Sequence, residues 1–159
     1  MNPPIELITL SSQDIDLTHP RACESLECFL DCNTILYICA GIKKQLGDCI
    51  ENYKKNILMV QNILKAKKIL ECKKVVFLSS AEVYGEEVNN LTISENTVCL
   101  PTTYYGLAKK HSEDLLKMVY ERAHRRTLIL ARMPLVYGPQ ETQNIYGPSG
   151  FTSTALAGK

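Results

Sequence analysis

Lys74-Val-Val-Phe-Leu-Ser-Ser80 is the stretch that decides the fold of this chain. Its apolar residues follow one another without alternation, which is typical of a strand buried on both faces of a parallel sheet. Two hydroxyl residues, Ser79 and Ser80, close the run. Ligands of open α/β sheets bind at the carboxyl ends of the strands, so we expect these serines at a binding site. A second strand-like run is Thr127-Leu-Ile-Leu-Ala-Arg132.

The segment between these two runs has the pattern of an amphipathic helix. Its apolar face is expected to carry Leu107, Leu115, Leu116, Val119 and Ala123. Its polar face is expected to carry Lys110, Glu113, Asp114, Lys117, Glu121 and Arg122. The helix should begin near Tyr105, where Thr102 or Thr103 would cap it.

Tyr105 and Lys109 are four residues apart and therefore share one face of the predicted helix. A free phenol has a pKa of about 10, and a nearby ammonium lowers it because it favours the phenolate. This makes Tyr105 a candidate general acid or base. The spacing alone also occurs by chance on many amphipathic helices, so its context has to support the function.

Three ordered motifs supply that context. They are Ser79-Ser-Ala-Glu-Val-Tyr-Gly85, Pro101-Thr-Thr-Tyr-Tyr-Gly-Leu-Ala-Lys109 and Arg132-Met-Pro-Leu-Val-Tyr-Gly-Pro139. Together they resemble the extended short-chain dehydrogenase/reductase superfamily, and within it the NAD-dependent epimerases and dehydratases of nucleotide sugars. The resemblance implies an α/β fold with a Rossmann-like, doubly wound parallel sheet, and NAD as the cofactor.

The resemblance also implies which residues would contact NAD. Asp31–Gly41 looks like the fourth strand of the family, whose small terminal residues let the adenosine half approach. Asn56 matches the asparagine that supports the catalytic lysine through hydrogen bonds, and Asp16 with Leu17 matches the segment that contacts adenine. The complete expected set is Asp16, Leu17, Cys39, Ala40, Gly41, Asn56, Ser79, Tyr105, Lys109, Met133 and Pro134.

Catalytic roles follow from the same resemblance. Tyr105 would exchange a proton with a sugar hydroxyl while the nicotinamide takes or gives a hydride. Lys109 would hold the nicotinamide ribose, and Ser80 would hydrogen-bond the reacting hydroxyl. Glu82 stands where sugar dehydratases carry a base, but Ala81 replaces the usual acidic or hydroxyl partner of that base. Glu82 is therefore either a catalytic base or a surface residue.

The front of the chain departs from the family pattern. The fold binds pyrophosphate through a glycine-rich turn after its first strand, and no glycine precedes Gly41. Met1–Leu10 is instead expected to begin at the second or third strand. The first strand is central in the 3-2-1-4-5-6 strand order, so its loss should leave a strand-wide gap. We expect residues 1–159 to form a truncated NAD(P)-binding Rossmann-like domain, with the C-terminal substrate domain mostly absent.

The expected partner is a nucleotide-diphosphate sugar. Leu135 stands where many epimerases carry an asparagine that contacts the sugar nucleotide, so no particular sugar is indicated. The family also implies a possible homodimer through the helix that carries Tyr105 and Lys109. Two alternatives to an epimerase or dehydratase stay open: a ketosugar reductase of the same superfamily, and a non-catalytic remnant or split subunit that needs a partner chain.

Composition sets further bounds. A net charge of +1 with 22% charged residues argues against a surface dedicated to nucleic acid or membrane. No apolar run reaches the about 18 residues that span a bilayer, and no leader pattern opens the chain, so a cytoplasmic location is expected. The seven cysteines show no Cys-x-x-Cys spacing, which favours reduced, mostly buried thiols over a metal site.

Overall fold

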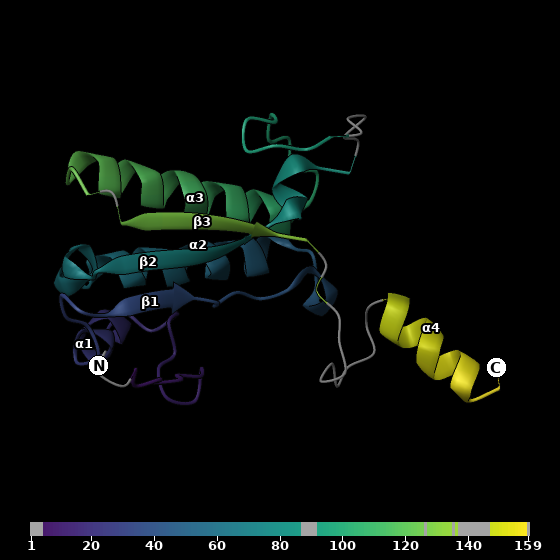
Figure 1. Ribbon diagram of the computed structural model, residues 1–159, viewed down its shortest axis with the longest axis horizontal. Helices are drawn as coiled ribbons and strands as arrows, with labels where there is room; N and C mark the ends of the chain where they lie inside the picture. The colour runs from purple at the N-terminus through teal and green to yellow at the C-terminus, as the bar shows by residue number, and fades with distance from the viewer. Residues whose placement is uncertain (1–4, 87–91, 126, 135, 137–146, 159) are drawn as a thin grey trace.

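A three-stranded parallel sheet forms the centre of the protein (Figure 1). The computed structural model describes residues 5–86, 92–125, 127–134, 136 and 147–158. The strands are β1 (Ile35–Ile38), β2 (Lys74–Ser80) and β3 (Leu128–Met133), and they lie in the order β1-β2-β3. The strand predicted at residues 74–80 is confirmed with these bounds, and the one predicted at 127–132 is confirmed with a shift of one residue.

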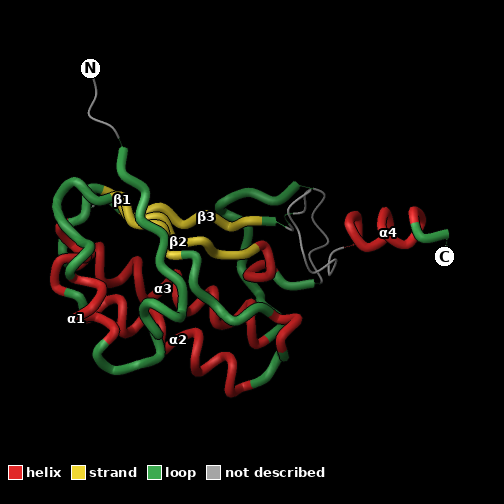
Figure 2. Tube along the Cα trace, turned by 90° about the horizontal axis from the view of Figure 1, so that it is seen from below, coloured by secondary structure: helices red, strands yellow, loops and turns green. Residues whose placement is uncertain are grey.

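The described residues contain four helices, and two of them make the crossovers between the parallel strands. They are α1 (Ala22–Glu27), α2 (Ile50–Lys65), α3 (Tyr104–Arg122) and α4 (Gly147–Leu156), with the short 3₁₀ turns η1 (Lys44–Leu46), η2 (Lys67–Glu71) and η3 (Ala81–Tyr84). Because parallel strands need a long connection, α2 joins β1 to β2 and α3 joins β2 to β3. Figure 2 shows α1, α2 and α3 on the same side of the sheet, while α4 stands apart from it.

The hydrophobic core lies between the sheet and these helices. Val75 and Phe77 of β2 are 0% and 1% exposed, and they pack with Val60 of α2 and Leu116 of α3. The hydroxyl of Tyr120 on α3 is also buried, and it donates a hydrogen bond to the carbonyl oxygen of Ile69 at 3.2 Å. This packing fixes α2 and α3 against the sheet and so places their N-terminal ends at the carboxyl ends of the strands.

The opposite face of the sheet is largely apolar, and in the described part of the chain its two outer strands are exposed on it while Val76 of the central strand is 9% exposed. Tyr37, Val76 and Ile129 are neighbours in the strand register, and Tyr37 and Ile129 are 62% and 43% exposed. Parallel sheets are normally covered on both faces. In the described part of the chain, helices cover only one of them, and no strand pairs with the outer edge of β1.

Among the described residues, the expected partial α/β sheet without its first strand is therefore confirmed. The prediction of a strand in Met1–Leu10 is wrong for the residues that are described, because residues 5–10 have no regular secondary structure. Ile5 and Leu7 are 96% and 83% exposed. A strand is stable only when its backbone groups pair with a neighbour, and this segment has no strand beside it.

The cysteine side chains are more exposed than expected. All seven thiols are free, but only Cys72 is buried, so the prediction of mostly buried thiols is wrong. The other six lie in loops, in helices or at their ends, where water reaches them. Within the described residues, no helix is long and apolar enough to cross a membrane, and no cluster of His, Cys, Asp and Glu side chains is arranged to hold a metal ion.

Candidate active site

Lys109 is the buried centre of the candidate site. Lys109 is only 6% exposed, and its ammonium donates hydrogen bonds to the carbonyl oxygens of Leu78 at 2.7 Å and Ala40 at 3.5 Å. These two carbonyls lie near the carboxyl ends of β2 and β1. The ammonium is also 4.8 Å from the ring centre of Phe77 and 5.8 Å from that of Tyr105. The predicted proximity of Lys109 and Tyr105 is thus present.

The loop after β1 closes over the lysine. A Cβ atom at Gly41 would lie 3.3 Å from the Lys109 nitrogen, so the missing side chain lets the backbone approach it. Asn56 holds the same loop, since its side chain accepts from the Ile42 amide at 2.7 Å and donates to the Ile42 carbonyl at 3.1 Å. Asn56 therefore supports the loop beside Lys109 through two hydrogen bonds to the backbone of Ile42.

A small cavity lies between the loop after β1, strand β2 and helices α2 and α3. Its volume is about 10 Å³, the size of one water molecule. Ala40, Gly41, Asn56 and Lys109 line it together with Val60, Phe77, Ala108 and Ser112. This cavity is too small for a nicotinamide ring, so a dinucleotide would have to lie over the open ends of the strands.

The first turn of α3 packs against η3, which directly follows Ser80. Thr103 caps the helix as predicted, because its hydroxyl accepts from the Gly106 amide at 3.0 Å. A Cβ at Gly106 would lie 2.5 Å from the Glu82 carbonyl oxygen, so only glycine permits this approach. The contact brings Tyr105 and Ser80 to the same corner of the molecule.

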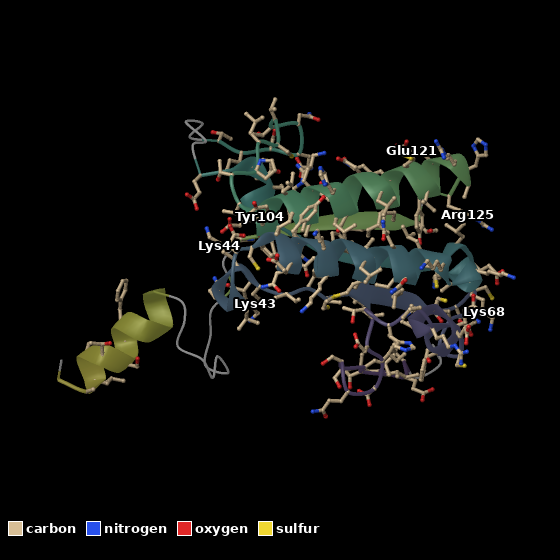
Figure 3. The ribbon with its side chains drawn as sticks, turned by 180° about the vertical axis from the view of Figure 1, so that it is seen from behind. Lys43, Lys44, Lys68, Tyr104, Glu121 and Arg125 are labelled. Carbon is tan, nitrogen blue, oxygen red and sulfur yellow. The ribbon has the colours of Figure 1, made fainter. Side chains whose placement is uncertain are left out.

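Glu82 is engaged by two partners. Its carboxylate is 3.4 Å from the ammonium of Lys44 and accepts a 3.2 Å hydrogen bond from the Thr103 hydroxyl. Lys44 also contacts Glu86 at 2.8 Å. Figure 3 shows Lys43, Lys44 and Tyr104 at the end of the sheet and its helices that faces α4, and Lys68, Glu121 and Arg125 at the opposite end. The Ser80 hydroxyl accepts from the Glu82 amide at 3.2 Å and keeps its own proton to donate.

A buried ion pair lies beneath this corner, and the sequence pattern did not indicate it. Glu113 is 0% exposed, and its carboxylate receives Nε and Nη2 of Arg132 at 2.9 and 2.7 Å. Its predicted place on the solvent face of the helix is therefore wrong. Arg132 also donates to the Tyr84 hydroxyl at 3.0 Å. Burial raises the pKa of Glu113, but the hydrogen bonds and the positive charge of Arg132 outweigh it and lower the pKa overall.

The remaining predicted residues occupy different places. Ser79 is 5% exposed and faces Glu113, and its hydroxyl has no partner of normal hydrogen-bond geometry among the described residues. Cys39 is exposed after β1. Asp16 binds Thr18 in its own turn, and the carbonyl of Leu17 accepts from Asn62 of α2 at 2.9 Å. No contact joins this last pair to Lys109 in the described structure.

Two predicted residues follow the end of the sheet. Met133 is the last residue of β3, opposite Ser80 in the register, and it is 41% exposed. Pro134 comes next and is also exposed. Leu135 and the Tyr137-Gly-Pro139 part of the third motif lie outside the described residues.

Comparison with known proteins identifies the family. The model of the NAD-dependent epimerase/dehydratase family matches residues 2–157. The chain belongs to this family. A search of curated proteins gives no match.

Solved structures agree with the family fold. The UDP-glucuronic acid 4-epimerase of Bacillus cereus in complex with NAD superposes with a TM-score of 0.71 at 23% identity, over 94% of this chain and 44% of that one. The UDP-N-acetylglucosamine 4-epimerase of Methanobrevibacter ruminantium M1 gives 0.69 at 26% identity, over 84% and 44%. The dTDP-glucose 4,6-dehydratase of Bacillus anthracis in complex with NAD gives 0.68 at 21% identity, over 90% and 43%. The chain thus spans less than half the length of these relatives.

The family is NAD-dependent, and the residues present fit one half of that cofactor. Gly41 has no side chain beside the Lys109 ammonium, which suits a ribose placed over the strand ends, although the lysine is 6% exposed and bonded to the Leu78 and Ala40 carbonyls in this structure. The pyrophosphate half has no glycine-rich turn in this chain, since no glycine precedes Gly41. The expected homodimer through α3 stays a prediction, which light scattering would test.

The stability contributed by Lys109 should rise with pH. Burial lowers the pKa of Lys109 from 10.5 to about 8. Between these values the unfolded chain binds one more proton than the folded chain, so unfolding becomes less favourable as pH rises. We expect the unfolding free energy of the wild type, relative to Lys109→Met, to increase by about 3 kcal/mol from pH 7 to pH 10.5.

Denaturant unfolding at several pH values measures this difference, and groups common to both proteins cancel in it. Lys110→Met is the matched control, because Lys110 is the next residue and forms an i,i+4 pair with Asp114 at the surface. Its difference from the wild type should stay flat over the same range. A flat difference for Lys109→Met as well would show that the lysine is hydrated in the folded state.

Proposed function

We propose that this chain carries the catalytic part of an NAD-dependent nucleotide-sugar epimerase. The observation that carries the proposal is the position of Lys109, which is buried under the ends of β1 and β2, beside Gly41 and one turn after Tyr105. Two of the similar solved structures are 4-epimerases of UDP-sugars. Their substrates suggest the class of substrate for this chain.

Each residue would have one task in this proposal. Lys109 would bind the nicotinamide ribose and hold positive charge near the phenol of Tyr105, which favours the phenolate. Tyr105 would then exchange a proton with the sugar hydroxyl. Ser80 would donate a hydrogen bond to that hydroxyl, because its oxygen accepts from the Glu82 amide and its own proton stays available to donate. NAD, when bound, supplies the hydride acceptor for the sugar carbon.

The surroundings of Glu82 favour an epimerase over a dehydratase. A dehydratase needs a carboxylate that is free to remove a proton from carbon. Here the Glu82 carboxylate is 3.4 Å from the Lys44 ammonium and accepts a hydrogen bond from the Thr103 hydroxyl, so it would have to leave these contacts to reach a proton on carbon. An epimerase makes no demand on this position.

Binding of NAD to the purified chain tests the proposal. We expect measurable binding by titration calorimetry at millimolar NAD, and a loss of at least about tenfold in affinity in Tyr105→Phe/Lys109→Met, since both contacts to the ribose and nicotinamide end are removed. Lys110→Met should bind like the wild type. If the folded wild-type chain binds no NAD at millimolar concentration, catalysis by this chain alone is ruled out.

That negative result would favour a second candidate, a subunit that acts only with a complementary polypeptide. The specific observation is the outer edge of β1, which no described strand pairs, next to a sheet face on which Tyr37 is 62% exposed. Free edges and open apolar faces are typical sites of association. A separate polypeptide that restores both the missing strand and NAD binding when mixed with this chain would establish it.

A further inference from the structure

The first turn of α3 is capped by a side chain from a different part of the sequence. The first amides of a helix have no partner within the helix. Thr103 satisfies the Gly106 amide locally. The two amides before it, those of Tyr105 and Tyr104, instead donate to the carboxylate of Asp48 at 2.9 and 3.3 Å. Asp48 lies between η1 and α2, 57 residues before Tyr105.

The loop that carries Asp48 is itself held in place. The Asn52 side chain of α2 donates to the Gly47 carbonyl at 2.8 Å. On the other side, Lys44 reaches Glu82 and Glu86. This loop continues from Gly41 and Ile42, which lie beside Lys109. The Asn56 side chain forms hydrogen bonds with the Ile42 backbone there. The carboxylate therefore connects the helix start to the same loop that closes over the lysine.

A charged acceptor is well suited to this task. Carboxylates are favoured at helix N-termini by the helix dipole, and hydrogen bonds to a charged acceptor are stronger than neutral ones. Asp48 is exposed, so water competes for its oxygens and its contribution to global stability is modest. A local cap such as Thr103 stabilises the helix itself. Only a cap from another element can also fix where the helix starts relative to the loop.

We propose that Asp48 is a positioning residue for Tyr105. It fastens the turn that carries the phenol to the loop beside Lys109, and so sets the distance between the phenol and the ammonium. The importance of this distance for catalysis rests on the function proposed above. The alternative is a role in stability alone, in which any loss of Asp48 would loosen the helix and the rest of the fold together.

Amide hydrogen exchange in the full chain, followed by NMR, separates these two roles. In Asp48→Ala the exchange of the Tyr104 and Tyr105 amides should accelerate on the order of tenfold. The Gly106 amide should keep its protection, because its partner Thr103 is unchanged. Asp48→Asn, which keeps an oxygen acceptor, should restore most of the protection. Asp31→Ala is the matched control, since Asp31 is also an exposed loop aspartate that accepts a backbone amide, that of Asn33 at 2.9 Å.

The resonances of the Lys109 side chain provide the second measurement. The Tyr105 ring lies 5.8 Å from the Lys109 nitrogen, and ring shifts change when that distance changes. Asp48→Ala should move these resonances, whereas Asp31→Ala should leave them in place. Equal acceleration at residues 104, 105 and 106, or unmoved Lys109 resonances, would overturn the proposal. If the wild-type chain binds no NAD, the proposed function is ruled out. The positioning of Tyr105 by Asp48 is a separate question, which the NMR spectra of the variants still decide.

Discussion

Replacing Arg132 with methionine is expected to lower the unfolding free energy by about 3–5 kcal/mol at neutral pH. The loss is large because Glu113 is 0% exposed and its carboxylate would remain in the core without its bidentate partner. The hydrogen bond from Arg132 to the Tyr84 hydroxyl would also be lost, so the η3 turn, which contains Tyr84, would lose one of its contacts with β3. Urea unfolding of the wild type and the variant measures the change.

A double variant and a surface control sharpen this test. Glu113→Leu/Arg132→Met removes both charges, so it should be more stable than Arg132→Met alone, because no uncompensated charge stays buried. Arg122→Met is the surface control, since Arg122 is an exposed residue at the end of α3, the helix that carries Glu113. An Arg132→Met protein as stable as Arg122→Met would mean that Glu113 is neutral or hydrated.

The pH dependence of the two proteins should have opposite signs at acidic pH. In the wild type the pKa of Glu113 is lowered from 4.5, so its contribution to stability is present above that value and is lost as the pH falls through the folded pKa. In Arg132→Met the dominant remaining influence is burial, which raises the pKa of Glu113. Protonation then relieves the buried charge, and the deficit of the variant should shrink as the pH falls.

Gly85→Ala is expected to cost about 3 kcal/mol or more, the second large effect. Gly85 follows η3 with φ +83°, a conformation that residues with a side chain rarely adopt. A Cβ there would also overlap the carbonyl oxygen of Leu100, which is backbone and cannot rotate away. Leu100 precedes the Pro101–Thr103 entry to α3, so relief of the overlap would displace the start of that helix.

Gly158→Ala separates the cost of the backbone conformation from the cost of the overlap with the Leu100 carbonyl oxygen. Gly158 has φ +69°, and no described atom lies within 4 Å of the place that a Cβ would take, so its substitution carries the conformational cost without the overlap. Because Gly158 follows α4, which stands apart from the sheet, we expect its substitution to cost at most about 1 kcal/mol. Thermal unfolding of both variants compares them. Equal losses would show that the contact between Gly85 and Leu100 gives way easily.

Local sequence patterns were sufficient for the elements and for part of the site. The unbroken apolar run of β2 required burial, and the spacing of Leu116 with its neighbours required a helix. Thr103 was recognisable as a cap because capping acts between residues three apart. The proximity of Tyr105 and Lys109 follows from helical geometry alone, and it is present.

Interactions between distant residues were not accessible in the same way. Glu113 follows the pattern of a solvent-facing residue, and only the position of Arg132 on β3 makes it a buried partner. Asp48 looks like an ordinary residue before α2, and only the packing of α3 against α2 turns it into a cap for Tyr105. Residues 5–10 have the composition of a strand, but a strand exists only where another strand pairs with it.

The sequence by itself determined the strands near residues 74–80 and 127–132, the helix between them with the face shared by Tyr105 and Lys109, and the absence of a glycine before Gly41. These depend on local periodicity and composition, which are properties of neighbouring residues. The tertiary structure decided that Lys109 is buried against carbonyls near the ends of two strands, that Glu82 is held by Lys44, and that the helices of the described residues cover only one sheet face. These depend on which surfaces meet when the chain packs, because burial and charge pairing arise only between segments that folding brings together.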